Sequence, residues 1–135
     1  MAARSKARKR ALDILYASDM RREPAEVALD RAIADGEGPT NEYTAALVRG
    51  VGAHQPRIDE VLSTYSEGWT LERMPAVDRN VLRIAVYELL WGDDVPDAVA
   101  MSEALALVGD LSTDESPAFV NGLLGAIQRS KATLV

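Results

Sequence analysis

Apolar residues recur at helical spacing along most of the chain, and no segment alternates apolar and polar residues as a half-buried strand does. β-branched residues do not cluster in runs either. The pattern therefore predicts an all-α fold of about seven helices. The predicted helices span 4–21, a weaker segment after Pro24, 42–53, a segment from Pro56 to Gly68, 76–91, a segment after the turn at 92–96 that ends near Gly109, and a last segment that begins at Ser116.

Glycine and proline mark the predicted ends of these helices. The stretch 35–39 contains two glycines and ends in proline, which is typical of a loop. Gln55 precedes Pro56, and proline is tolerated in the first turn of a helix but disrupts its interior. We therefore expect a break between two helices there, and we expect Gly68 to end the second of them.

The first predicted helix carries basic residues on its apolar face. At the helical repeat, Arg4 and Arg8 continue the line of Ala11 and Leu15. We therefore expect this end of the helix to project beyond the core, where cations on several sides suit contact with phosphate groups.

The segment 76–91 is the most apolar of the chain. It leaves only a narrow polar strip, which is formed by Arg79, Arg83 and Tyr87. A helix that is apolar almost all round is normally buried, so we expect this one to lie at the centre of the fold.

The last predicted helix opens with Ser116 and Pro117, an N-cap residue followed by the residue type preferred at the first helical position. Gly122 and Gly125 lie inside this helix, where each costs about 1 kcal/mol relative to alanine. Close approach of another helix or of a ligand would offset that cost, and helix packing is the favoured explanation.

Composition is typical of a globular cytoplasmic protein. The 135 residues fit one domain over 1–135, and 47% of them are hydrophobic, which argues against disorder. No apolar run reaches the roughly 20 residues of a membrane span, and the basic N-terminus lacks the apolar core of a secretory signal. Cysteine is absent, which excludes disulfides and thiolate metal sites and fits a reducing compartment.

The net charge of −6 conceals an asymmetry along the chain. The first ten residues contain five arginines and lysines and no acidic residue, whereas acidic residues outnumber basic ones in the remainder. This distribution argues against uniform binding to nucleic acid and permits a local contact with a polyanion at one end. A solvated, frayed terminus is the alternative.

No group of residues points to catalysis. The single histidine, His54, lies beside the predicted helix break, where a surface or capping role is usual. The common motifs for metal, nucleophile and nucleotide chemistry are absent. Acidic pairs in the turns are explained by favourable interaction with helix N-termini. We therefore expect no enzyme, no cofactor and no metal.

Three stretches carry a family resemblance when they are taken together. They are Ala7-Arg8 and Ala11 leading to Leu15-Tyr16, the run VDRNVLRIAVYEL at 77–89 followed by Asp94-Val95-Pro96, and Glu103-Ala104 followed by the run SPAFVNGLL at 116–124. In order and spacing they resemble the NusB family of antitermination factors from residue 4 to about residue 127. The first stretch alone is weak, whereas the two long runs at this spacing are specific.

The resemblance implies a fold and a function. The fold is two packed helical bundles in a single domain. NusB proteins pair with NusE, a small-subunit ribosomal protein, and the heterodimer binds the boxA element of nascent RNA. This assembly acts on the transcription elongation complex and supports processive antitermination, notably on ribosomal RNA operons.

The resemblance also implies RNA contacts near the N-terminus. Arg4, Lys6 and Arg8 match basic positions that contact RNA in the family, where cations neutralise phosphates. Lys9 and Arg10 lie where basic character is not a family requirement, so we rank them lower.

A second set of implied RNA contacts lies around the last helix. Phe119 matches an aromatic position that could stack on an unpaired base, and a core position is an equal alternative. Glu115 and Ser116 lie where the family's RNA surface continues, although Ser116 also fits an N-cap. Asn121 could bond to RNA, and a structural hydrogen bond is slightly favoured.

Tyr16 and Asp78 match positions at the family's NusE interface. A tyrosine suits an interface because it is apolar with a polar tip, and core packing is its alternative. Arg79 is basic, as in other members, and fits either the RNA or the NusE surface.

The sequence also departs from the family pattern. Ser102, Ala106 and Gly109 replace an asparagine, an acidic residue and a lysine, which weakens the case for an RNA contact from 97–110. Two alternative functions stay open: a NusB-like domain in ribosomal RNA maturation, and a helical module that binds only protein. The residues do not decide between a monomer and a homodimer.

Overall fold

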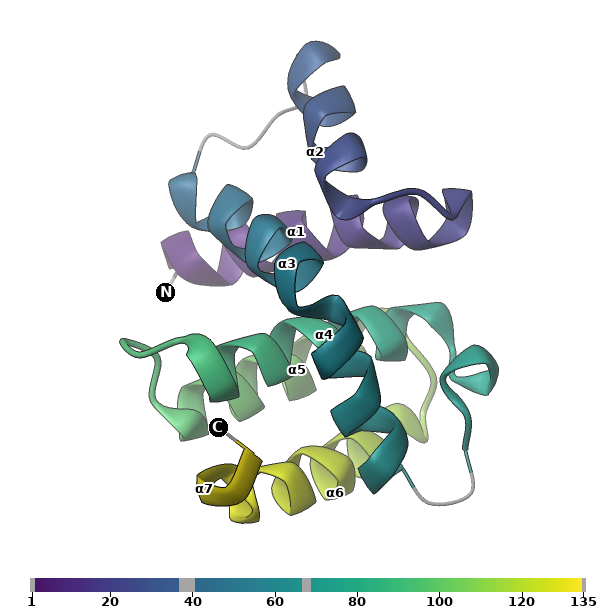
Figure 1. Cartoon of the computed structure of the whole chain (residues 1–135), viewed down its shortest axis with the longest axis vertical. Helices are drawn as coiled ribbons and strands as arrows, with labels where there is room; N and C mark the ends of the chain where they lie inside the picture. The colour runs from purple at the N-terminus through teal and green to yellow at the C-terminus, as the bar shows by residue number, and fades with distance from the viewer. Residues whose placement is uncertain (1, 37–40, 67–68, 135) are drawn as a thin grey trace. The chain divides into compact units, whose positions relative to one another are not determined.

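The computed structural model describes residues 2–36, 41–66 and 69–134. Within these ranges the chain forms seven α-helices, one short 3-10 helix and no strand, which confirms the prediction of an all-α fold with about seven helices (Figure 1). The chain divides into two compact units, Met1–His54 and Gln55–Val135. Each unit is described by itself below.

The first unit contains α1 (Ala2–Arg21), α2 (Ala25–Ala34) and the first half of α3 (Glu42–Tyr65). The turn from α1 to α2 places Arg22 in the left-handed backbone region, with φ of 55°. At the same turn the Ser18 hydroxyl donates a hydrogen bond to the Glu23 carbonyl over 2.6 Å. The core of this unit is aliphatic, and its side chains with no exposed area are those of Ala11, Leu29, Leu47, Val48 and Val51.

Helix α3 runs without interruption through Pro56, so the predicted break at Gln55 and Pro56 is wrong. A proline inside a helix removes one backbone hydrogen bond and costs about 3 kcal/mol. Burial of the apolar residues around it offsets that cost, since Val51 precedes Pro56, Ile58 and Leu62 follow it, and all three are 0% exposed. The boundary between the two compact units falls at this same point of the helix.

The second unit is built around the helix predicted to be central. Helices α4, α5 and α6 lie side by side in Figure 1 and contact one another, and most of α4 is buried, which confirms the prediction for 76–91. The unit contains the second half of α3, the 3-10 helix η1 (Leu71–Arg73), α4 (Ala76–Trp91), α5 (Asp97–Leu111), α6 (Ser116–Arg129) and α7 (Lys131–Leu134).

The structure differs from the predicted boundaries in short elements. Neither η1 nor α7 was expected, because elements of three or four residues carry no full apolar period. Helix α5 continues past Gly109, which has no positive φ and therefore does not terminate it. The expected stop at Gly68 and most of the expected loop at 35–39 lie outside the described residues.

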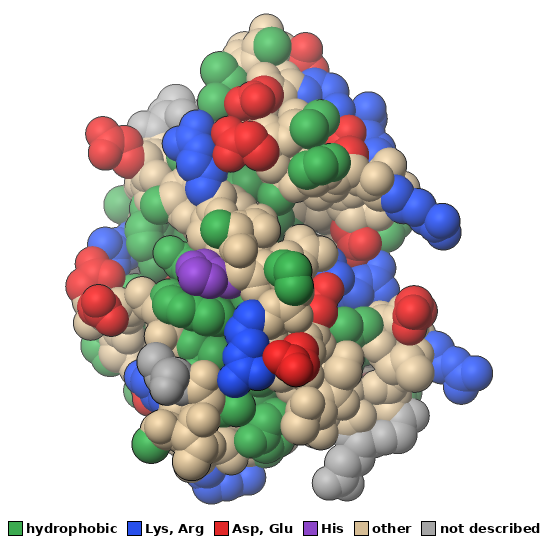
Figure 2. All heavy atoms as spheres, viewed as in Figure 1, with side chains coloured by type: hydrophobic (Ala, Val, Ile, Leu, Met, Phe, Trp, Pro, Cys, Tyr) green, Lys and Arg blue, Asp and Glu red, His purple; other side chains and the backbone are tan. Residues whose placement is uncertain are grey.

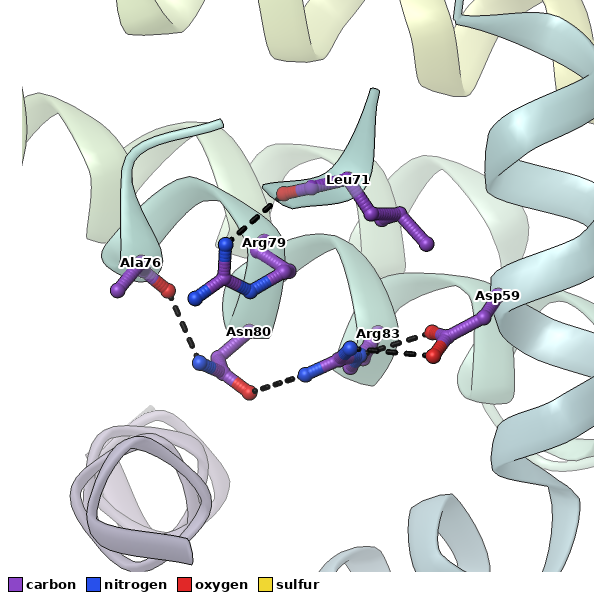
Figure 3. Close-up of polar contacts among 6 residues, drawn as sticks. All are labelled: Asp59, Leu71, Ala76, Arg79, Asn80 and Arg83. Atoms are coloured by element: carbon purple, nitrogen blue, oxygen red, sulfur yellow. Dashed lines mark hydrogen bonds and ion pairs between the residues drawn. The ribbon is translucent and has the colours of Figure 1, made fainter. Parts of the chain in front are cut away.

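An ion pair between a half-buried aspartate and a buried arginine joins the second half of α3 to α4. Arg83 donates from Nε and Nη2 to the two carboxylate oxygens of Asp59 over 2.8 and 3.1 Å. Its Nη1 donates to the side chain of Asn80 over 3.2 Å, and Asn80 donates in turn to the Ala76 carbonyl (Figure 3). The polar strip predicted on this helix is therefore mostly satisfied inside the protein.

A second ion pair joins the start of α5 to the C-terminal helix, and it makes stability depend on pH. The hydrogen bond from Lys131 over 2.8 Å lowers the pKa of Asp97 below its ordinary value of 3.8. A carboxylate with a depressed pKa contributes stability that is present above about pH 4 and is lost as the pH falls through the folded-state pKa. We expect Lys131→Gln to return the pKa toward 3.8, as measured from the Asp97 carboxyl carbon shift by NMR. An unchanged titration midpoint in this variant would contradict the assignment.

Candidate functional site

The basic N-terminal residues fall into two environments. Arg4 and Lys6 are exposed on α1, whereas Arg8 is only 3% exposed. The guanidinium carbons of Arg4 and Arg8 lie 4.2 and 5.6 Å from the centroid of the Tyr43 ring, distances typical of cation–π contacts. Arg4 is therefore an exposed cation whose position is stabilised by an aromatic ring of α3.

The expected projection of this helix end beyond the core is wrong for Arg8. The start of α3 packs against this part of α1, and the Thr44 hydroxyl donates to the Ala7 carbonyl over 3.0 Å. Ala7 and Thr44 are buried with Arg8, at 2% and 1% exposure. The sequence pattern of α1 alone could not reveal a neighbour that lies some 36 residues further on.

Asn41 holds the first turn of α3 in place beside α1. Its side-chain oxygen accepts a hydrogen bond from the Tyr43 backbone N–H over 2.8 Å, and its side-chain nitrogen donates to the Ala3 carbonyl over 3.3 Å. These contacts fix the backbone of Tyr43, whose ring makes the cation–π contacts with Arg4 and Arg8. Neither Asn41 nor Tyr43 was predicted to belong to the site.

Ser116 and Asp78 form a buried hydrogen-bonded group in the second unit. The Ser116 hydroxyl donates to Asp78 Oδ2 over 2.9 Å and accepts from the Thr113 backbone N–H over 3.2 Å. Asp78 Oδ1 also accepts from the Ser112 hydroxyl over 2.6 Å. Both Ser116 and Asp78 are 2% exposed, so neither side chain lies on the surface of the described structure.

The predicted N-cap role of Ser116 is wrong. Glu115 occupies the cap position without a side-chain cap, and Ser116 is already the first residue of α6. Its hydroxyl donates to Asp78 across helices, and its oxygen accepts from the Thr113 N–H, which lies before the helix. Pro117 does lie in the first turn, as predicted.

Arg79 lies at the start of α4 and supports the neighbouring segment. Its Nη1 donates to the carbonyls of Leu71 and Met74 over 2.8 and 3.2 Å, which ties η1 to α4 (Figure 3). Tyr16, the other residue expected at a partner interface, is 40% exposed, and Met20 one turn later is 49% exposed. Tyr16 and Met20 therefore form a small exposed apolar patch on α1 of the first unit.

Around α6, three predicted residues remain accessible. Glu115 and Asn121 are exposed and Phe119 is half-buried. The Phe119 ring contacts the indole of Trp69, with centroids 5.6 Å apart and a tilt of 38°. Trp69 is 46% exposed and was missed by the sequence reasoning. The sequence did contain a signal that could have identified it: this tryptophan lies in a polar segment between two predicted helices and belongs to the apolar face of neither.

The two glycines of α6 are not explained by helix packing, and that expectation is wrong. A Cβ built at Gly122 would meet no described atom within 4 Å, and one at Gly125 would meet only the flexible side chain of Arg129 at 3.3 Å. We expect Gly122→Ala to raise the free energy of unfolding by about 0.5–1 kcal/mol, because alanine loses less backbone entropy in a helix. Urea titration of both proteins measures this.

A matched glycine gives the opposite expectation. A Cβ at Gly92 would lie 2.8 Å from the carbonyl oxygen of Glu88, a backbone atom that cannot easily move. Gly92→Ala should therefore destabilise the protein while Gly122→Ala stabilises it. A loss of stability in Gly122→Ala would show that an unseen contact occupies that face.

The positions that depart from the family pattern lie on α5. Ser102 and Ala106 are exposed, and the Ser102 hydroxyl donates to the Val99 carbonyl of its own helix over 3.3 Å. A Cβ built at Gly109 would have no described atom within 4 Å of it. These substitutions therefore change the surface of α5 and leave its core face, with Ala104 and Val108, intact.

The predicted site residues fall into two groups. The first unit contains Arg4, Lys6, Arg8 and Tyr16. All the other predicted site residues, Glu115 among them, belong to the second unit. On the face drawn in Figure 2, basic and acidic side chains are interspersed and do not gather into one patch.

In the described ranges, no helix is long and apolar enough to cross a membrane, and no cluster of histidine and acidic residues could hold a metal ion.

Comparison with known proteins extends the resemblance to nearly the whole chain. "Transcription antitermination protein NusB" of a Nocardioides species is 75% identical over 134 residues, which cover 99% of both chains. The structure of T. maritima NusB superposes with a TM-score of 0.85 at 36% identity, covering 96% of this chain and 92% of that one. A crystal structure of antitermination factors NusB and NusE in complex with double-stranded RNA matches with a TM-score of 0.83 at 26% identity, covering 96% and 98%.

The family assignment rests on a match that covers most of the sequence. The model of the NusB family matches residues 5–129, which include every predicted site residue except Arg4. This chain therefore belongs to the NusB family of transcription antitermination proteins.

Proposed function

We propose that this protein binds boxA-containing RNA together with NusE and supports processive transcription of ribosomal RNA operons. The observation that carries the proposal is the pair of exposed cations at the start of α1, Arg4, which lies against the Tyr43 ring, and Lys6. A similar protein has been crystallised with NusE and RNA, which supports both partners. The protein would act in the cytoplasm, as one domain, on the transcription elongation complex.

The described contacts divide the candidate RNA residues by role. Arg4, Lys6 and Asn121 are exposed and would touch RNA directly, with the two cations on phosphates and the amide on polar groups. Arg8 is buried, with its guanidinium carbon 5.6 Å from the centroid of the Tyr43 ring, and would position that ring and Arg4. Ser116 is also buried, and it would position the first turn of α6.

Phe119 of α6 and Glu115, which directly precedes this helix, are also proposed to face the RNA. Phe119 would stack on an unpaired base with the exposed part of its ring. Glu115 is exposed beside it and would accept hydrogen bonds from base amino groups, since a carboxylate repels phosphates.

NusE would dock on the exposed apolar patch of α1. Tyr16 and Met20 expose large side chains one helical turn apart, which is typical of an interface anchor. Asp78 and Arg79 are also proposed to serve NusE binding, and because their side chains are bonded within the second unit, they would act by holding the local structure of that unit.

Loss of one N-terminal cation is expected to weaken RNA binding in a salt-dependent way. Lys6→Ala should lower the slope of log affinity against log salt by about 0.7, because one phosphate contact on single-stranded RNA is lost. The measurement is anisotropy of a fluorescent boxA RNA, titrated with and without purified NusE at several salt concentrations. Arg4→Ala should behave in the same way.

Lys9→Ala is the matched control for these variants. It removes the same charge from the same helix, but Lys9 is engaged with Asp13 over 2.9 Å. We expect it to leave affinity and salt dependence nearly unchanged. Equal losses for Lys6→Ala and Lys9→Ala would indicate a general charge effect and no defined contact.

Absence of RNA binding by folded wild type with NusE present would overturn the proposed function and leave a protein-binding module. Light scattering on the same samples would reveal a homodimer.

A further inference from the structure

Trp69 has a fixed backbone and an exposed side chain. The Ser66 hydroxyl, itself on a residue only 6% exposed, donates to the Trp69 carbonyl over 2.8 Å, immediately before η1. Yet 46% of the tryptophan remains accessible. An indole in a core role would bury nearly all of its surface, so packing explains only part of this side chain.

The exposed indole is one half of an aromatic pair. Its partner is Phe119 of α6, at 5.6 Å between centroids and 38° between planes. The two rings are tilted and not parallel, and the indole keeps an accessible surface that a further aromatic group could cover. Among the exposed large apolar residues of the described structure, Trp69 is set apart by this ring contact. The others are Tyr16, Met20, Val27, Ile33, Val99 and Leu111.

We propose that Trp69 is a second base-stacking residue and that, with Phe119, it holds two unpaired nucleobases of a bound single strand. This inference rests on the proposed function and assigns Trp69 a role that the family resemblance did not carry. The surroundings suit a nucleobase better than an aliphatic protein surface, because the exposed Glu115, one helical turn before Phe119, offers an acceptor to base amino groups. Base–aromatic stacking tolerates any base, since every base has a π-face.

The chain contains two tryptophans, which allows a direct test by fluorescence. Trp91→Phe leaves Trp69 as the single tryptophan, and Trp69→Phe leaves Trp91, which lies against Tyr87 with centroids 6.1 Å apart. Each protein is titrated with boxA RNA in the presence of a NusE that lacks tryptophan. We expect stacking to quench the Trp69 fluorescence and to leave the Trp91 fluorescence nearly unchanged.

Affinity measured on the same samples provides the second arm. Trp69→Leu should weaken RNA binding by roughly 5- to 100-fold, the range expected for loss of one stacked base. Trp69→Phe should retain most of the affinity, because a smaller ring still stacks. An RNA with an abasic site at the stacked nucleotide should remove the quenching of Trp69, whereas abasic sites elsewhere should not.

The outcomes separate this inference from the function on which it rests. If anisotropy shows RNA binding while Trp69 fluorescence and Trp69→Leu affinity stay unchanged, the stacking role of Trp69 is overturned and the proposed function stands. If wild type binds no RNA in the presence of NusE, both are overturned. Should Trp69→Leu fail to fold, the fluorescence of Trp91→Phe still decides, since that variant leaves Trp69 in place.

Discussion

Asp59→Ala is expected to lower the free energy of unfolding by about 3 kcal/mol, measured by urea denaturation at neutral pH. The reason lies in its partner, because the Arg83 side chain is 9% exposed and would lose a carboxylate bonded at two points. Asp59 itself is 27% exposed, which places the effect at the lower end of the range for a buried ion pair.

Two further variants make this expectation specific. Glu60→Ala removes the neighbouring carboxylate, whose pair with Arg57 is exposed at 65% and 42%, and should change stability by less than about 0.5 kcal/mol. Combining Asp59→Ala with Arg83→Met should recover much of the loss, since no unpaired buried charge remains. Equal effects for Asp59 and Glu60 would mean that the Arg83 pair contributes no more than a surface one.

The second large effect is expected at Asp78. Asp78→Ala should cost about 2–3 kcal/mol, because the buried Ser116 hydroxyl and the half-buried Ser112 hydroxyl lose their carboxylate acceptor. Asp78→Asn should cost less, because the amide keeps one oxygen in place. Urea denaturation measures both, and NusE binding by the folded variants is measured in parallel.

This experiment also decides how Asp78 relates to the proposed partner. Glu115→Ala serves as the control, since it removes an exposed carboxylate next to Ser116, the hydrogen-bond partner of Asp78, and should leave stability nearly unchanged. Normal stability of Asp78→Ala together with weakened NusE binding would place Asp78 in the interface and contradict the structural role.

Helices with a long apolar period could be predicted from the sequence. Whether burial of apolar residues outweighs a local helix-breaking residue could not. The helix at 76–91 was predicted with its exact bounds, because its apolar pattern is long and a turn follows it. The break at Pro56 was predicted wrongly, since a local rule cannot weigh one lost hydrogen bond against burial of Ile58 and Leu62. That the chain is not an enzyme follows from its membership in a family of antitermination proteins.

Candidate site residues could be predicted by type but not by exposure. Arg8 and Ser116 carry polar side chains at positions where tertiary neighbours, distant in sequence, bury them. Trp69 escaped notice because a single aromatic residue has no periodicity, and only its contact with Phe119 reveals a surface. The exposure of Arg4 and Lys6 agrees with their proposed role and leaves that role a prediction.

The buried polar residues of α4 have a consequence for genetics in living cells. Asp78 and Arg83 lie in the run that identifies the family, yet both side chains are bonded inside the protein. Variants at these positions would raise the unfolded fraction and be removed by proteases, so a screen for loss of antitermination would recover them through low abundance. Immunoblots would separate them from variants of Lys6 or Trp69, which should accumulate to normal levels and fail only in activity.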